Sequence, residues 1–97
     1  MTKSIAIVTG GTRGIGLSIT KTLMKEGFDV AAIYHGNQEA AKICEKETGA
    51  SAFKADVSDY DSCLKVLEKI EKKMGAVAAL VNNAGITRDG VLHKMRS

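Results

Sequence analysis

Apolar residues follow two different periods along the first part of the chain. Four consecutive apolar residues, Ile5–Val8, precede a cluster of glycines, and this pattern predicts a short buried strand. Beyond the cluster, Ile15, Ile19 and Leu23 recur every four residues, so they share one face of a helix. Gly27 is a natural stop for that helix.

The alternation of strand and helix patterns continues through the chain. Three further strands are expected at residues 30–34, 51–54 and 79–81, and two further helices at 39–48 and from about 59 to 74. In the last helix Cys63, Leu67, Ile70 and Met74 line one face, and Gly75 ends it. The segment 56–59 offers side chains that cap the start of this helix.

This order of elements, β-α-β-α-β-α-β, predicts an α/β fold with a parallel sheet and right-handed crossovers. We expect a Rossmann-like, three-layer arrangement with strand order 3-2-1-4, truncated after the fourth strand. The third helix is then expected on the opposite face from the first two. Residues 1–97 are interpreted as a single, partial nucleotide-binding domain.

Composition narrows the function without defining it. The 97 residues are 44% hydrophobic and carry a net charge of +3, without a basic stripe interleaved with aromatics, so nucleic acid is not an expected partner. Cys44 and Cys63 have no metal-ligand spacing and are expected to be buried, reduced thiols. Neither a signal peptide nor a membrane span is recognisable in the sequence, and a cytoplasmic location without membrane contact is expected.

The glycine-rich segment 9–16, with the sequence TGGTRGIG, joins the first strand to the first helix. Gly10 allows the chain to turn, Gly14 leaves room for a pyrophosphate to approach the backbone, and Gly16 permits close packing of the helix on the strand. The free N–H groups at the helix start attract phosphate. The alternative is a plain tight turn, and a P-loop is excluded because no GK[ST] follows the glycines.

The spacing Gly-x-x-x-Gly-x-Gly resembles that of the short-chain dehydrogenase/reductase family. Two further motifs support the resemblance: NNAG at residues 82–85, after the fourth strand, and the pair Asp56-Val57 after the third. All three occur in the family's order and together span nearly the whole chain.

The resemblance implies a site for a nicotinamide cofactor. Its residues would be Thr9, Gly10, Thr12, Arg13, Gly14, Ile15, Gly16, Tyr34, Asp56, Val57, Asn82, Ala84 and Gly85. Asp56 would accept a hydrogen bond from the adenine amino group, although a simple helix cap is the alternative. Asn82 would tie the central strands together, although an ordinary strand-ending turn is the alternative.

The end of the second strand bears on the choice of cofactor. An NAD site usually has a carboxylate there, which accepts a hydrogen bond from the ribose 2′-OH. Here Tyr34 is followed instead by His35, Gly36 and Asn37. Arg13 would pair with a 2′-phosphate as a planar fork, or else remain a solvated loop side chain. His35 or Asn37 would add a hydrogen bond. The sequence therefore favours NADP(H).

The segment 82–95, NNAGITRDGVLHKM, resembles the bacterial ketoacyl reductase branch of the family. Residues 47–63 resemble acetoacetyl-CoA reductases of polyhydroxybutyrate synthesis, with 3-oxoacyl-acyl-carrier-protein reductases of fatty-acid synthesis as the alternative. A 3-oxoacyl thioester is the implied substrate of the parent protein, and a homotetramer its implied assembly. The helices that usually form that tetramer are not recognisable here.

The family's catalytic Ser and Tyr-x-x-x-Lys motif do not occur in these residues. The motif needs a lysine four residues after the tyrosine, but Tyr34 is followed at this spacing by Gln38 and Tyr60 by Leu64. We therefore expect this chain to be inactive as it stands, as a truncated part of a reductase. A non-catalytic nucleotide-binding remnant is the alternative.

Overall fold

Seven elements alternate between strand and helix in the computed structural model, which describes residues 4–12 and 14–83. They are β1 (Ile5–Thr9), α1 (Gly14–Lys25), β2 (Asp29–Tyr34), α2 (Gln38–Thr48), β3 (Ser51–Lys54), α3 (Tyr60–Met74) and β4 (Val77–Asn82). Each element predicted from the periodicity is present, with ends that coincide with the predicted ones or differ by one or two residues. The α/β class is therefore confirmed.

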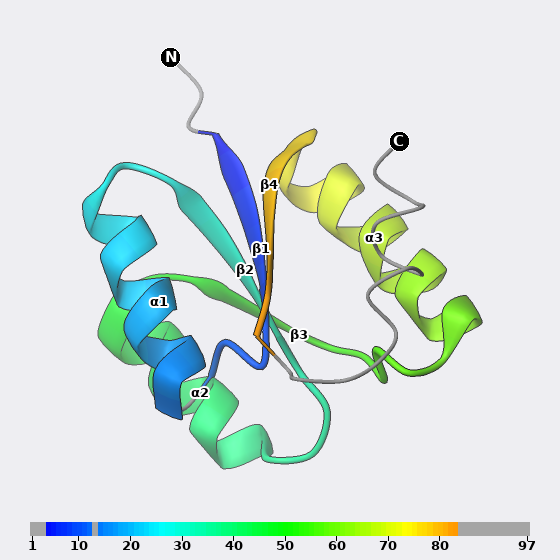
Figure 1. The fold of residues 1–97 in the computed structure, drawn as a ribbon, viewed down its shortest axis with the longest axis horizontal. Coiled ribbons are helices and arrows are strands. Elements are labelled where there is room, and N and C mark those ends of the chain that lie inside the picture. Colours follow the sequence, from blue (N-terminus) through cyan, green and yellow to red (C-terminus); the bar gives the residue numbers. More distant parts are fainter. Residues whose placement is uncertain (1–3, 13, 84–97) are drawn as a thin grey trace.

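The four strands form one parallel sheet in the order β3-β2-β1-β4, as predicted. Thr9, the last residue of β1, lies opposite Ile33 of β2 and Asn82 of β4. Because all four strands run the same way, the loops that follow them meet at one edge of the sheet, the lower edge in Figure 1. In open parallel sheets this edge is where ligands bind.

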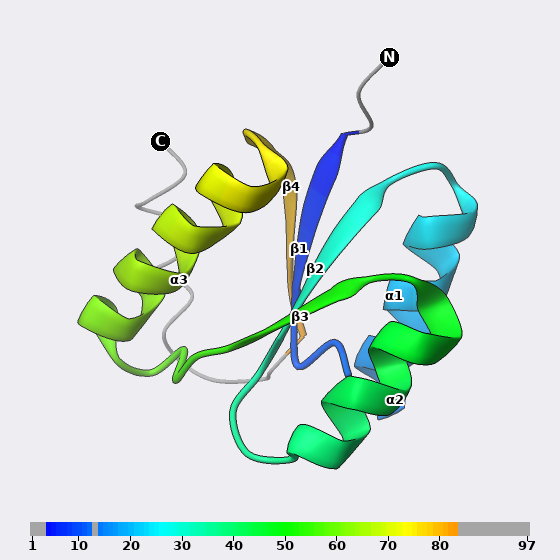
Figure 2. The same ribbon diagram turned by 180° about the vertical axis from the view of Figure 1, so that it is seen from behind.

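Helices cover both faces of the sheet (Figures 1 and 2), with α1 and α2 on one side and α3 on the other. The α3 side holds a core in which Val66 and Ile70 pack on Ile7, Ile33 and other buried strand residues. Alternate residues of a strand point to opposite faces, so Ala6 and Val8 belong instead to the cluster under α1. The predicted placement of the third helix is confirmed.

The helix ends show how the sequence sets their limits. The Asn37 side chain accepts a hydrogen bond from the Ala40 N–H at 2.9 Å and caps α2. Asp59 caps α3 by accepting from the Asp61 N–H at 3.1 Å, so the capping residue is Asp59 and not Asp56. Gly49 ends α2 with φ of 81°, in the left-handed region that favours glycine.

Helix α1 differs from its prediction at its start. It begins at Gly14, and Ile15 is 75% exposed, whereas Ile19 and Leu23 are partly buried against the core. The packed stripe of this helix therefore begins one turn later than the four-residue spacing suggested. Ile15 stands at the edge where the loops meet, beyond the end of the sheet's core.

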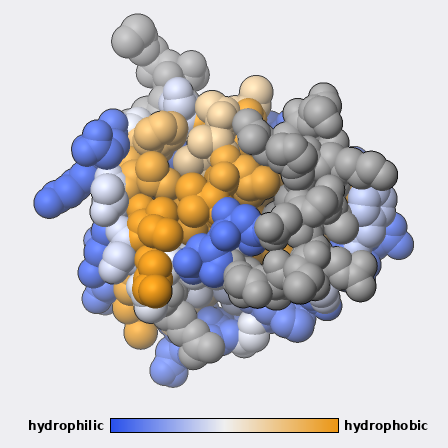
Figure 3. All heavy atoms as spheres, viewed as in Figure 1, coloured by the Kyte–Doolittle hydropathy of each residue, from blue (hydrophilic) through white to orange (hydrophobic). Residues whose placement is uncertain are grey.

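Hydrophobic side chains remain visible at the surface beside α1 (Figure 3). Partly buried apolar residues of this side include Ile19, Leu23, Phe28, Ala79 and Val81. In the described part of the chain β4 pairs with β1 alone and forms one edge of the sheet. No helix among the described residues is long and apolar enough to cross a membrane.

Candidate functional site

A pocket of about 300 Å³ lies at the edge where the strands end. It is formed by the loops that follow β1, β2 and β4. Its lining residues are Gly10, Thr12, Tyr34, His35, Gly36, Asn37 and Asn83. The pocket therefore combines the glycine segment with the end of the second strand, two of the places where the sequence predicted cofactor contacts.

The glycine loop is fixed by backbone bonds to the neighbouring strand. The N–H groups of Gly10 and Gly11 both donate to the carbonyl of Ile33, at 2.8 and 3.3 Å. Gly10 has φ of 62° and Gly14 has φ of 61°, backbone angles that residues with a side chain rarely adopt. Apart from its chain neighbours and its own helix, no described residue has an atom within 4 Å of the position that a Cβ of Gly14 would take. That side of the Gly14 backbone is therefore open in the described part of the chain, and its contact with a phosphate stays a prediction.

Gly16 makes the closest approach in the loop. A Cβ at this position would overlap the carbonyl of Gly10 and lie 2.6 Å from Nδ2 of Asn83. The helix start therefore packs against the loop itself and against the end of β4. The need for glycine at position 16 was predicted, but its neighbours were expected to belong to the strand.

Thr9 connects the ends of β1 and β4 beneath the pocket. Its fully buried hydroxyl accepts from the Asn83 N–H at 2.8 Å and lies 3.1 Å from Oδ1 of Asn82. Nδ2 of Asn83 also donates to the Gly10 carbonyl at 3.3 Å. The prediction that Asn82 ties the central strands together agrees with this geometry, and Asn83 adds a link to the glycine loop.

Asp56 lies in the loop after β3 and bonds to its own neighbours. Its Oδ1 accepts from both the hydroxyl and the N–H of Ser58, at 2.6 and 3.0 Å. The Ser58 hydroxyl, then the Ser58 N–H, and to a smaller extent nearby His35 hold the pKa of the Asp56 carboxyl below its ordinary value. Both bonds fall on Oδ1, so Oδ2 remains for a ligand donor.

Both cysteines are free and buried, as predicted, and each lies under a loop at the sheet edge. Cys44 Sγ is 3.7 Å from the Gly11 carbonyl, and Cys63 Sγ is 3.5 Å from the Val57 carbonyl. Burial raises the pKa of both thiols above the ordinary value. A raised pKa disfavours the thiolate, so neither thiol is activated as a nucleophile.

The pocket brings together some of the predicted site residues and not others. Gly10, Thr12 and Tyr34 line it. Thr9, Gly16 and Asn82 support it from beneath, and Val57 packs on the α3 side of the core. Arg13, Ala84 and Gly85 lie outside the described residues.

Sequence reasoning missed two lining residues, Gly36 and Asn83, as site residues. Asn83 was named only as part of the NNAG motif, yet its side chain reaches both Gly10 and the position beside Gly16. Its signal was available, because it directly follows the residue of β4 that lies opposite Thr9.

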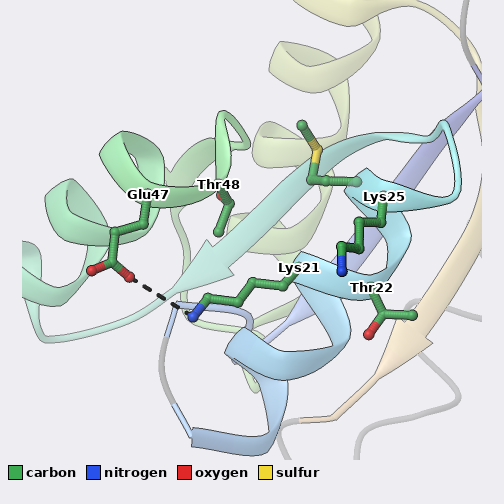
Figure 4. A pocket seen from close by; sticks show the side chains of 6 residues that line it. Lys21, Thr22, Lys25, Glu47 and Thr48 are labelled. Atoms are coloured by element: carbon green, nitrogen blue, oxygen red, sulfur yellow. Dashed lines mark ion pairs between the residues drawn. The ribbon is translucent and has the colours of Figure 1, made fainter.

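A second pocket, of about 490 Å³, lies between α1 and α2 (Figure 4). Lys21 of α1 reaches toward Glu47 of α2 across it, with Lys21 Nζ 4.0 Å from Glu47 Oε1, and Lys25 also lines the pocket. These side chains are about half exposed, so this ion pair adds little stability. None of the predicted site residues lines this pocket. No cluster of metal-binding side chains occurs in the described part of the chain either.

Comparison with known proteins agrees with the motifs. A family model described as short chain dehydrogenase matches residues 4–97. An acetoacetyl-CoA reductase of Paracoccus denitrificans is 50% identical over 91 residues, which cover 94% of this chain and 38% of that protein. A 3-oxoacyl-acyl-carrier-protein reductase of Staphylococcus aureus (strain Mu50 / ATCC 700699) is 43% identical, covering 99% of this chain and 41% of that protein.

Solved structures of related reductases have a similar fold. A variant of the actinorhodin polyketide ketoreductase, crystallised with NADPH, superposes with a TM-score of 0.80 at 32% identity. The superposition covers 89% of this chain and 36% of the ketoreductase. This chain thus spans about two fifths of the length of the curated relatives it matches.

Proposed function

Because the chain belongs to the short-chain dehydrogenase/reductase family, we propose that it binds NADP(H) in the pocket at the carboxyl ends of β1, β2 and β4. One observation carries this proposal: residues of the glycine loop and residues at the end of β2 line the same pocket. The loop also leaves the Gly14 backbone open while Gly16 packs against Gly10. This is the space that a pyrophosphate needs beside a helix start.

The other predicted residues receive their roles as part of this proposal. Gly10, Gly14 and Gly16 would line the pyrophosphate, and Ile15 would contribute a backbone contact. Oδ2 of Asp56 would accept from the adenine amino group, with Val57 against the ring. Thr9 and Asn82 would fix the strand ends beneath the cofactor. Arg13, Ala84 and Gly85 remain predictions, as phosphate and ribose contacts.

The preference for the phosphorylated cofactor is supported by the residues at the end of β2. Tyr34, His35 and Asn37 line the pocket there, and none of the lining residues that the structure describes is acidic. A carboxylate at this place would repel a 2′-phosphate. Asp56 lies close enough to His35 to interact with its charge, and its Oδ1 is already bonded to Ser58.

For the whole protein to which these residues belong, we propose reduction of a 3-oxoacyl thioester, with acetoacetyl-CoA as the substrate. The similarity to acetoacetyl-CoA reductases, at 50% identity, supports this choice. Bound NADPH supplies the hydride in such a reaction. The described residues bind and orient the cofactor, and neither Tyr34 nor Tyr60 has a lysine four residues on to act with it.

Titration of the chain with NADPH and NADH, followed by calorimetry, tests the cofactor proposal. We expect NADPH to bind more tightly. In a His35→Asp variant the new carboxylate is expected to weaken NADPH binding and leave NADH binding nearly unchanged. The matched His35→Asn variant removes the imidazole without adding charge and should change the ratio much less. Equal affinity for both cofactors in the unsubstituted chain would contradict the preference.

A second candidate substrate is a 3-oxoacyl-acyl-carrier-protein, because a reductase of that kind matches 99% of this chain at 43% identity. In a longer protein that contains these residues, NADPH oxidation with each thioester separates the two candidates. Faster turnover of acetoacetyl-CoA is expected. Faster turnover of the acyl-carrier-protein thioester would establish the second candidate.

The chain of 97 residues is itself proposed to be inactive. Mixed with acetoacetyl-CoA and NADPH, it should leave NADPH absorbance unchanged while still binding the cofactor. Turnover would contradict this proposal. Failure to bind either cofactor would instead favour a remnant without nucleotide affinity.

A further inference from the structure

The carbonyl of Gly11, within the glycine loop, is approached by side-chain donors from two helices. Oγ1 of Thr20, in α1, donates to it at 2.9 Å, and Sγ of Cys44, in α2, lies 3.7 Å from it. Both side chains are fully buried. A hydroxyl inside a helix ordinarily donates to its own preceding turn. Thr20 instead reaches nine residues back and ties its helix to the loop.

The position that a Cβ of Gly11 would take is already crowded by neighbouring atoms. A Cβ there would lie 2.9 Å from Oγ1 of Thr20, 2.9 Å from the carbonyl of Val8 and 3.1 Å from Cβ of Ala32. Position 11 is therefore glycine because of packing. The same packing, together with the Thr20 hydroxyl, fixes the orientation of the Gly11 carbonyl.

This orientation bears on the next N–H group in the loop. In a planar trans peptide the C=O of one residue and the N–H of the next point in opposite directions. The Gly10 and Gly11 N–H groups are already bonded to Ile33. The Thr12 N–H has no acceptor in the described part of the chain, and Thr12 lines the pocket. A carbonyl of Gly11 held toward the helices directs the Thr12 N–H away from them.

We propose that Thr20, supported by Cys44, is a positioning residue for the cofactor. It holds the Gly11 carbonyl toward the helices and thereby presents the Thr12 N–H to a phosphate-bearing ligand in the pocket. Thr20 itself does not touch the ligand. The inference rests on the proposed function, and it adds that the affinity for NADPH depends on the buried Thr20 hydroxyl, which contacts the loop and not the ligand.

Substitution of Thr20 by valine tests this role, because valine keeps the shape and removes the donor. We expect the Kd for NADPH to rise about tenfold, the equivalent of one buried hydrogen bond. Thr20→Ser retains the donor and should restore most of the affinity. Thr22→Val makes the same change at an exposed position of α1 and should leave the Kd unchanged. Cys44→Ala should weaken binding less than Thr20→Val, because a thiol is the poorer donor.

A general loss of stability must be separated from this effect. Ile70→Val loosens the core under α3, on the other face of the sheet, and provides a variant with a lowered melting temperature but an unchanged loop. If it weakens NADPH binding as much as Thr20→Val does, the positioning role is wrong. Equal Kd values for Thr20→Val and the unsubstituted chain would also overturn it, while the cofactor proposal would stand. Absence of any binding by the unsubstituted chain would overturn both.

A measurement on the unsubstituted chain covers the case in which Thr20→Val does not fold. In ¹⁵N NMR spectra recorded with increasing NADPH, the Thr12 amide should shift more than the amides of Gly10 and Gly11, which already have an acceptor. A Thr12 amide that does not move in the presence of bound NADPH would overturn the inference.

Discussion

The glycine loop after β1 and the Asp56 loop after β3 lie at the same edge of the sheet but are held in different ways. The glycine loop takes its partners from other elements: Ile33 at the end of β2, Thr20 in α1 and Asn83 after β4. Thr12, within it, is only 5% exposed. Its shape therefore depends on the whole fold.

In the loop after β3, Asp56 takes its hydrogen-bond partners from residues close to it in the sequence. Asp56 bonds to Ser58, two residues on, and the Asp56 N–H donates to the hydroxyl of Ser62 at 2.9 Å. The bonds of its carboxylate are exposed to solvent. The two loops thus differ in what a substitution disturbs. A change in the first is expected to disturb packing between elements, and a change in the second only a local turn.

The largest effect is expected for Gly16→Ala. Alanine in a helix is ordinarily favoured over glycine by about 1 kcal/mol. Here its Cβ would overlap the Gly10 carbonyl, and a forced shift of packed backbone costs about 3 kcal/mol. We therefore expect the free energy of unfolding in urea to fall by about 2 kcal/mol, the difference between the two effects, and NADPH binding to be lost.

The matched control for this substitution is Gly36→Ala, at an exposed glycine where no described residue apart from its chain neighbours has an atom within 4 Å of the Cβ position. It should change the free energy of unfolding by less than about 0.5 kcal/mol. If Gly16→Ala proved as stable as this control, the loop would not depend on the packing described for it.

Thr9→Val is expected to have the next largest effect. The substitution keeps the volume of a fully buried side chain and removes the acceptor of the Asn83 N–H. A buried polar group deprived of its partner costs about 1–3 kcal/mol, so thermal unfolding should occur at a clearly lower temperature. Thr22→Val, at an exposed site, provides the control. Equal melting temperatures for the two variants would show that the connection between β1 and β4 is not maintained by this hydroxyl.

The same contrast explains what the sequence could predict. The glycine spacing, the alternation of periods and the strand order follow from short-range patterns, and so does Asp59 as a cap. The donors to the Gly11 carbonyl could not be predicted in the same way. Thr20 lies four residues after Gly16, on the same helix face, but a threonine at that spacing carries no sign of which carbonyl it will meet. Cys44 reaches the loop only because α2 packs beside α1.

The exposure of Ile15 has a similar cause. Its spacing to Ile19 is that of a packed face, but the helix extends past the end of the sheet at this point, and nothing in the periodicity marks where the core ends. The length of a neighbouring strand, rather than the helix's own pattern, decides which turn is buried.

The smallest effect is expected in the Asp56 loop, and it should depend on pH. The Ser58 hydroxyl lowers the pKa of the Asp56 carboxyl, so folding gains stability from the ionised carboxylate. That contribution is fully present above the ordinary carboxyl pKa of about 3.9 and is lost as the pH falls through the lowered value. Ser58→Ala should therefore lower the melting temperature slightly at neutral pH, and the difference from the unsubstituted chain should shrink under acid conditions.

Ser18→Ala, on the exposed face of α1, should give a difference that does not vary with pH. A Ser58→Ala difference of the same size at every pH would mean that the hydroxyl stabilises the turn without acting on the Asp56 charge. NMR titration of Asp56 decides the point directly, because its pKa should rise toward the ordinary value in Ser58→Ala and stay low in Ser18→Ala.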